Sequence, residues 1–207
     1  GDTNGFNDVF VRDRLNGTTE RVSVATGGAE GNYYSGSPSI SADGLFVAFS
    51  SGATNLVTGD TNTYWDVFVR DRLGGTTTRM SVNTAGVQGN GYADYPSVSA
   101  DGRYVAFVSV ASNLVAGDTN GFSDVFVHDR QSGTTERVSV DTGGAQGNFD
   151  SYAPSLSADG RFVAFHSYAT NLVAGDTNGF IDAFVRDRQS GTTERVSVAT
   201  GGAQGNS

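Results

Sequence analysis

Apolar and polar residues alternate along the chain in short segments, and no segment has the spacing of an amphipathic helix. Between residues 124 and 167 these segments are Asp124–Arg130, Thr134–Val140, Pro154–Ser157 and Arg161–Ser167. Val, Phe and Thr dominate them, as is usual in β-strands. Ser132-Gly133 connects the first two segments, and Asp159-Gly160 connects the last two. Such dipeptides favour tight hairpin turns. The pattern therefore predicts four antiparallel strands.

The same four segments recur with a period of 58 residues. Gly-Asp-Thr-Asn begins at Gly1, Gly59, Gly117 and Gly175, and the only prolines are Pro38, Pro96 and Pro154. A fixed period is the sequence signature of a repeat architecture. Four short antiparallel strands describe one propeller blade, and such blades pack face to face around a channel. We therefore predict an all-β fold, a β-propeller of four-stranded antiparallel blades.

Three stretches share a more specific pattern, Pro-x-x-Ser-x-Asp-Gly-x-x-apolar-Ala-Phe, and they are Pro38–Phe49, Pro96–Phe107 and Pro154–Phe165. This pattern resembles the repeat core of the TolB-type (WD-like) β-propeller family. The segments Asp-Val-Phe-Val-Arg-Asp-Arg and Thr-Thr-Glu-Arg-Val-Ser-Val are similar to that family's third and fourth strands. The resemblance covers essentially the whole chain and implies strands A, B, C and D from the channel outward. The repeat is longer than the family's, with its extra length in two inter-strand loops.

With this strand order, residues 1–207 form one partial propeller domain. A half blade (1–37) contributes a C–D hairpin, and full blades follow at about 38–82, 96–140 and 154–198. Propellers have about four to eight blades, so three and a half blades do not close a ring. An open blade face would expose a large apolar patch. We therefore expect a homo-oligomer that closes a six- or seven-bladed ring, and the alternative is that the chain is a fragment.

The loop between strands B and C carries the clearest chemical signal. Ca²⁺ binds about six to eight oxygens, supplied by alternating residues and by a carboxylate after a glycine turn. The Asp-x-Asn-Gly-x-x-Asp loops meet this demand and resemble those of integrin-type propellers, although the first acidic position is missing. The alternative is that Asp and Asn only form turns here. The predicted Ca²⁺ ligands are Asp2, Asn4, Asp8, Asp60, Asn62, Asp66, Asp118, Asn120, Asp124, Asp176, Asn178 and Asp182.

The repeats differ from one another mainly before each proline and around the B–C loop. The D–A and B–C connections of a propeller leave the same face, so the variable aromatic residues are expected to share one surface. Aromatic residues among polar neighbours are typical of surfaces that bind proteins or carbohydrates. The alternative is drift in exposed loops. The predicted ligand-binding residues are Tyr33, Tyr34, Trp65, Tyr92, Tyr95, Phe149, Tyr152 and Tyr168.

Composition narrows the function classes. Thirteen basic residues, all Arg, stand against 22 acidic ones, so no nucleic-acid partner is expected. The absence of cysteine excludes disulfides and thiolate metal sites. No apolar run reaches the roughly 18 residues that a membrane span requires.

The repeated Arg-Asp-Arg strings are expected to form edge or inter-blade ion pairs. His128 and His166 occupy non-equivalent positions without a nucleophile nearby in sequence, and we predict that the chain is not an enzyme.

Two function classes remain. The first is a non-catalytic, calcium-stabilised propeller scaffold that binds a protein or another ligand on its loop face. The resemblance to TolB-type repeats implies an extracellular or periplasmic location for it. The second is a lectin-like propeller that binds carbohydrate at several shallow sites. A propeller fragment without a biological ligand, defined only by its repeat assembly, is a further alternative.

Overall fold

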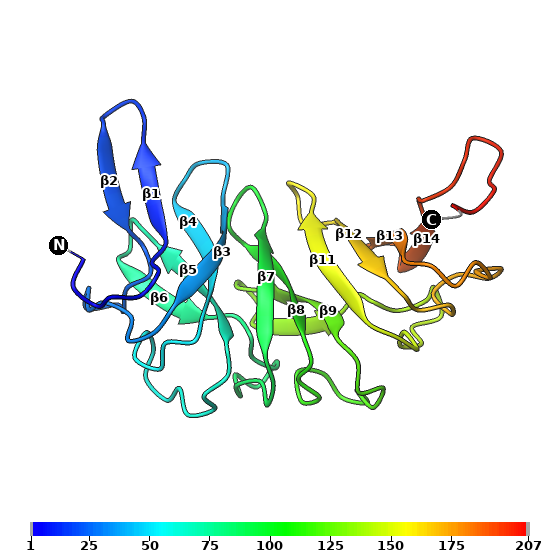
Figure 1. Ribbon diagram of the computed structural model, residues 1–207, viewed down its shortest axis with the longest axis horizontal. Coiled ribbons are helices and arrows are strands. Elements are labelled where there is room, and N and C mark those ends of the chain that lie inside the picture. The colour runs from blue at the N-terminus through cyan, green and yellow to red at the C-terminus, as the bar shows by residue number, and fades with distance from the viewer. Residues whose placement is uncertain (1, 206–207) are drawn as a thin grey trace.

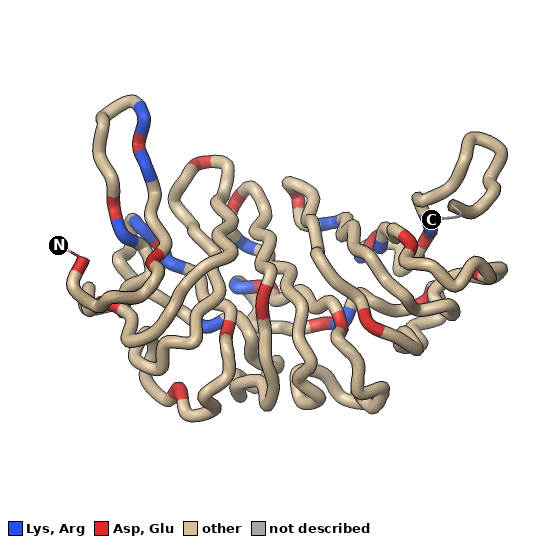
Figure 2. The backbone as a smooth tube through the Cα atoms, viewed as in Figure 1, with Lys and Arg blue, Asp and Glu red and all other residues tan. Residues whose placement is uncertain are grey.

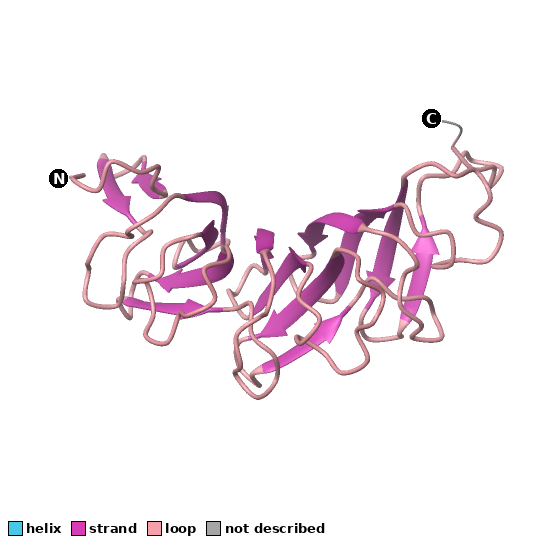
Figure 3. Cartoon of the chain, turned by 60° about the horizontal axis from the view of Figure 1, so that its bottom comes forward, coloured by secondary structure: helices cyan, strands magenta, loops and turns pink. Residues whose placement is uncertain are grey.

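The computed structural model describes residues 2–205, which form an open arc of β-sheets (Figure 1). Every regular element among these residues is a strand, as Figure 3 shows. Residues 1, 206 and 207, which the predicted domain included, lie outside the described residues. No helix with the length and apolar character of a membrane span occurs in residues 2–205.

The sheets follow one another along the chain. A two-stranded sheet, called the half blade, contains β1 (Phe10–Asp13) and β2 (Thr18–Arg21). Blade 1 contains β3 (Ser35–Ile40), β4 (Phe46–Ser51), β5 (Asp66–Asp71) and β6 (Thr76–Arg79). Blade 2 contains β7 (Ala93–Val98), β8 (Tyr104–Ser109), β9 (Asp124–Asp129) and β10 (Thr134–Arg137). Blade 3 contains β11 (Ser151–Leu156), β12 (Phe162–Ser167), β13 (Asp182–Asp187) and β14 (Thr192–Arg195).

Each four-stranded sheet is an antiparallel meander in chain order, which confirms the predicted blade. The strand bounds differ from the prediction in two places. The innermost strand was expected over 154–157 but runs over Ser151–Leu156, with a bulge between Tyr152 and Ser155. Pro154 lies in this bulge, where its missing N–H costs no ladder hydrogen bond, and the preceding Ala153 has a φ of 50°. The outermost strand was expected to reach Val140 but ends at Arg137.

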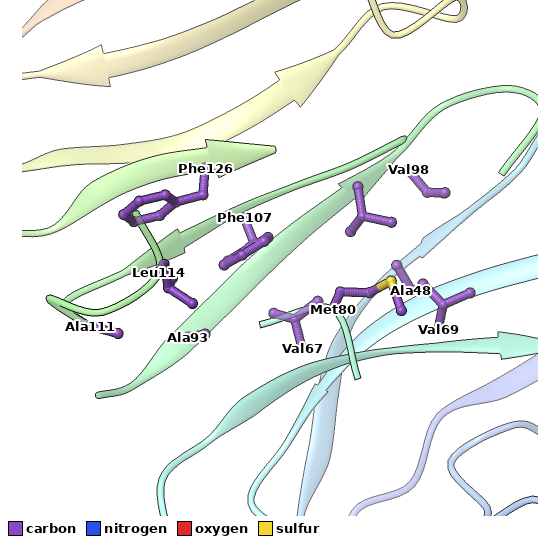
Figure 4. Packing of buried hydrophobic residues seen from close by; sticks show 11 residues of the cluster. Ala48, Val67, Val69, Met80, Ala93, Val98, Phe107, Ala111, Leu114 and Phe126 are labelled. Carbon is purple, nitrogen blue, oxygen red and sulfur yellow. The ribbon is translucent and has the colours of Figure 1, made fainter. Parts of the chain in front are cut away.

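The core lies between consecutive blades. Each blade has an upstream face, toward the preceding blade, and a downstream face, toward the following one. Phe107, Leu114 and Phe126 of blade 2 point upstream, and they pack against Val67, Val69 and Met80 of blade 1 (Figure 4). The rings of Phe107 and Phe126 stack with their centroids 5.9 Å apart. This packing explains why strand C is apolar on both faces, since one face covers each neighbour.

The A–B turn of blade 2 also touches the neighbouring blade. Gly102 has a φ of 73°, and a Cβ atom there would lie 2.0 Å from Cδ2 of Phe46 in blade 1. Gly44, the equivalent residue of blade 1, has a φ of 72°, but its nearest neighbour would be 3.7 Å away. Phe46 belongs to strand B of blade 1. The half blade, which precedes Gly44, has no strand B and therefore no equivalent ring. The two glycines therefore share a conformation and differ in packing.

Substituting these glycines separates the two effects. Gly44→Ala should cost about 1–2 kcal/mol of unfolding free energy, because an L-residue is strained in the left-handed region. Gly102→Ala should cost about 1–3 kcal/mol more, because the added methyl group overlaps the Phe46 ring. Urea unfolding of both variants measures the difference. Equal losses would show that the contact between Gly102 and Phe46 does not constrain the blade junction.

Candidate functional site

Each B–C loop is closed by an asparagine that bonds in three directions. Asn120 Oδ1 accepts the N–H of Phe122 at 3.1 Å, which forms a local turn. Asn120 Nδ2 donates to Asp124 Oδ2 at 2.9 Å and to the carbonyl of Gly147 at 3.0 Å. Gly121 takes a φ of 71° in this turn, and its counterpart Thr63 takes 62° in the second repeat. The loop geometry is therefore the same with or without the glycine.

An arginine of the outermost strand lies between the two aspartates of each loop. Arg137 Nη1 is 3.0 Å from Asp118 Oδ1 and 3.1 Å from Asp124 Oδ2. The Arg137 side chain is 9% exposed, and those of Asp118 and Asp124 are 6% and 0% exposed. Ser139 Oγ donates to the other oxygen of Asp124. We call this group the arginine-centred cluster.

The cluster recurs in every repeat. Arg79 lies 3.1 Å from Asp60 and 3.0 Å from Asp66, and Arg195 lies 3.1 Å from Asp176 and 3.5 Å from Asp182. In the half blade, Arg21 lies 3.3 Å from Asp2 and 3.0 Å from Asp8. Asp2 is half exposed there, so this copy is the most open to solvent.

These residues, as arranged, do not fit a Ca²⁺ ion. The guanidinium takes the place between the carboxylates, and the asparagine turns its nitrogen rather than its oxygen toward the aspartate. In residues 2–205 no group of three or more Asp, Glu, His or Cys side chains could hold a metal ion. Burial raises the pKa of Asp118 although Arg137 lies beside it. Calcium binding stays a prediction, and this geometry does not support it.

Six of the eight predicted aromatic residues gather in three clusters on the face of the B–C and D–A connections, which we call the loop face. Tyr33 and Tyr34 lie with Phe6, at centroid distances of 5.4 and 5.0 Å from its ring. Trp65 lies 6.4 Å from Tyr92. Phe149 stacks on Phe122 at 4.9 Å and meets Tyr168 edge-on at 5.9 Å. The rings therefore come together on one surface, as the loop topology predicted.

Two of the predicted ligand-binding residues lie elsewhere. Tyr95 and Tyr152 are within the innermost strands β7 and β11, at the bulges beside the prolines. Phe6 and Phe122 complete two clusters but were not predicted. The available signal was an aromatic residue two positions after each loop asparagine, at Phe6, Tyr64, Phe122 and Phe180.

The Arg-Asp-Arg strings contribute contacts between blades. Arg72 pairs with Glu20 of the half blade at 2.8 Å, which is an inter-blade ion pair of the predicted kind. Arg70 instead donates to carbonyl oxygens, among them that of Ala25 in the preceding D–A connection at 3.4 Å. His128 replaces this arginine in blade 2, and its Nδ1 lies 2.9 Å from Thr135 Oγ1. Burial lowers the pKa of His128, which favours its neutral form.

No protein-family model and no curated protein matches the sequence. Solved structures do match it. TolB from Acinetobacter baumannii aligns with a TM-score of 0.55 at 20% identity, over 91% of this chain and 37% of that one. An oligogalacturonate lyase in complex with manganese aligns with a TM-score of 0.55 at 14% identity, over 92% of this chain and 47% of that one. The tricorn protease aligns with a TM-score of 0.53 at 15% identity, over 89% of this chain and 16% of that one.

These similarities overturn one prediction. The chain was expected not to be an enzyme, but the same fold also occurs in a lyase and a protease. The lack of a nucleophile and base close together in the sequence therefore does not exclude catalysis. The chain spans less than half the length of each of these proteins. At these identities the likeness shows the fold alone, and the chain has the β-propeller fold found in TolB, as its repeat motifs predicted.

Proposed function

We propose that the chain is a β-propeller scaffold that binds an extended polypeptide on its loop face. The observation that carries this proposal is the gathering of aromatic rings into three clusters along that face. Tyr33, Phe149 and Tyr168 are 44%, 46% and 47% exposed, so their rings are available to a partner. Partly exposed aromatic rings supply large contact areas at protein interfaces. The clusters differ in composition, which suits a partner that contacts each blade differently.

Carbohydrate is the second candidate ligand. The Trp65 and Tyr92 rings lie together, and the Tyr92 hydroxyl donates to the carboxylate of Asp94. A flat apolar ring beside a hydrogen-bonding acid is a surface to which a sugar ring can bind. Asp94 also accepts bonds from Ser50 Oγ and from the N–H of Tyr95. Its oxygens are therefore largely used within the protein, which favours the polypeptide partner over the sugar.

Three further statements belong to this proposal. Arginine, rather than calcium, supplies the positive charge that holds each B–C loop, which is supported by the arginine-centred clusters. The chain associates with copies of itself, which is supported by the exposed faces at both ends of the arc. The protein works in an extracellular or periplasmic location, and the support for this is the structural similarity to TolB.

The binding proposal can be tested with a random peptide library displayed on phage and a glycan array. Peptides selected on the intact chain should bind the double variant Tyr33→Ala/Tyr168→Ala at least about tenfold more weakly, because truncating central aromatic residues removes about 2 kcal/mol or more. Leu73→Ala is the control, since Leu73 is 82% exposed in the C–D turn, at the other end of the strands. Undiminished peptide binding by the double variant, or binding to glycans alone, would contradict the proposal.

Removing one cluster arginine tests its structural role. Arg137→Gln leaves Asp118 and Asp124 buried without a cation, and it should cost about 3–5 kcal/mol of unfolding free energy. Arg103→Gln is the matched control, because the Arg103–Asp129 pair is 39% exposed on its arginine side and should contribute about 1 kcal/mol or less. Denaturant unfolding measures both. Similar losses in the two variants would mean that the cluster does not hold the loop.

The effect of Ca²⁺ on the melting temperature distinguishes loops that are held by arginine from loops that are held by calcium. The melting temperature of the intact chain should be the same in EDTA and in millimolar Ca²⁺, because the carboxylates already have a counter-ion. In Arg137→Gln, added Ca²⁺ should raise the melting temperature, because two buried carboxylates are released for an ion. Differential scanning calorimetry of both proteins in both buffers gives the answer. A higher melting temperature of the intact chain in Ca²⁺ would restore the calcium prediction.

A further inference from the structure

The downstream face of blade 3 exposes residues that the inner blades bury. Val196 is 45% exposed, whereas its equivalents Met80 and Val138 are 4% and 1% exposed. Ala164 and Val185 on the same face are partly exposed, and the equivalents of both are buried in blades 1 and 2. In strand β13 buried and partly exposed residues alternate over residues 182–185, whereas every residue of β9 is buried. One face of this sheet therefore has no cover among residues 2–205.

The half blade exposes the opposite face, the upstream one. Phe10 is 48% exposed, while its equivalents Phe68, Phe126 and Phe184 are completely buried. Thr19 is exposed as well, and its equivalents in the three blades are buried. The half blade and blade 3 lie at the two ends of the arc (Figure 1), so the ends expose the two complementary halves of one blade junction.

Every internal junction contains the same backbone contact. The hydroxyl of Thr135 in strand D donates to the carbonyl of Val82 in the preceding blade at 2.5 Å, and the Thr135 N–H donates to Thr84 Oγ1 at 3.1 Å. The corresponding threonines of blades 1 and 3 repeat both bonds with distances of 2.5 and 3.1 Å, and 2.6 and 3.1 Å. In a junction of the same kind between the half blade and blade 3, the threonine is Thr19. Its partners are the carbonyl of Val198 and the hydroxyl of Thr200.

The internal junctions also contain an arginine from the end of strand C. Arg188 of blade 3 pairs with Glu136 of blade 2 at 2.6 Å, and its guanidinium lies 4.5 Å from the ring centre of Tyr104. Arg103 covers the Tyr104 ring as well, at 4.7 Å. The equivalent positions at the ends of the arc are Arg14, Glu194 and Phe162. Phe162 has one arginine over its ring, Arg161 at 4.6 Å.

Charge complementarity identifies what covers these faces. Arg14 and Glu194 are both exposed, and neither forms an ion pair within residues 2–205. Figure 2 shows basic positions along β1 and at the start of its turn. In each junction the second of the two blades supplies three groups from strands C and D and the turn between them. These groups are the threonine, the arginine and a buried phenylalanine. The half blade has these two strands, so it retains the groups that make the junction's polar contacts.

We propose that two copies of this chain bind head to tail, with the half blade of one copy on the downstream face of blade 3 of the other. Arg14 of one copy then pairs with Glu194 of the other and covers its Phe162 ring, and Thr19 bonds to the carbonyl of Val198. This assignment rests on the proposed self-association and specifies its surfaces. The contact is heterologous, so two arcs close a ring only when both junctions form.

The charged contacts of the interface lie away from the aromatic clusters of the loop face. Arg14 lies in the C–D turn that follows strand C, and its proposed partner Glu194 is the third residue of strand D, the strand that follows that turn in blade 3. The aromatic clusters lie at the opposite end, where the B–C and D–A connections emerge. Charge changes at the interface therefore leave peptide binding unaffected, and aromatic substitutions leave association unaffected. Failure of one proposal is distinguishable from failure of the other.

Charge reversal tests the assignment by sedimentation equilibrium over a range of concentrations. The intact chain should sediment as a dimer, and Arg14→Glu or Glu194→Arg should each weaken association at least about tenfold, because each places like charges in both junctions. An equimolar mixture of the two variants should regain dimers. In that mixture one junction has the reversed pair, and the other has the original pair.

Gln131→Arg is the control, since Gln131 is exposed in the C–D turn of blade 2, and it should associate like the intact chain. Far-ultraviolet circular dichroism checks that each variant keeps its fold. A monomeric intact chain at all concentrations would overturn the proposal. It would equally be overturned by dimers that tolerate both reversals, or by variants that associate no better when mixed than alone.

Discussion

Each four-stranded sheet in this chain carries apolar side chains on both faces, and each face must be covered by another sheet. The inner blades satisfy this requirement with phenylalanine pairs that stack upstream and with aliphatic residues that point downstream. Burying such side chains contributes about 1.5–3 kcal/mol each. Because the contacts run from one blade to the next, the stability of a blade depends on its neighbours rather than on a separate core. The direction of each strand and the position of each loop follow from this stacking.

Much of the fold could be predicted from the sequence, because its determinants are local and occur several times. Turn dipeptides, alternation and period together predicted the strands and their order. The bulge at Pro154 was not predicted, and the strand was expected to start at the proline instead of Ser151. A bulge depends on pairing with strand B, which the sequence pattern of a single strand does not reveal. The early end of β10 at Arg137 has a similar origin, since Val140 pairs instead with Gln146 in an isolated bridge.

The candidate site was predictable in its location and less so in its chemistry. The topology alone places the B–C and D–A connections on one face, so the aromatic clusters were expected there. The partner of the loop aspartates was missed because Arg137 is 13 residues beyond Asp124 and on another strand. Only the antiparallel register of β9 and β10 brings the two together. A sequence shows which oxygen ligands a loop offers, and the fold determines which cation reaches them.

The arginine-centred cluster has a consequence for how such a chain can grow. The arginine and the two aspartates that it contacts belong to the same 58-residue unit, so every duplication of the unit copies the acid and its counter-ion together. A gain or loss of blades then leaves every remaining pair of loop aspartates with its own arginine. Repeat number can then change by recombination without separating the aspartates from their arginine, and selection is left to act on the surfaces between blades and on the loops.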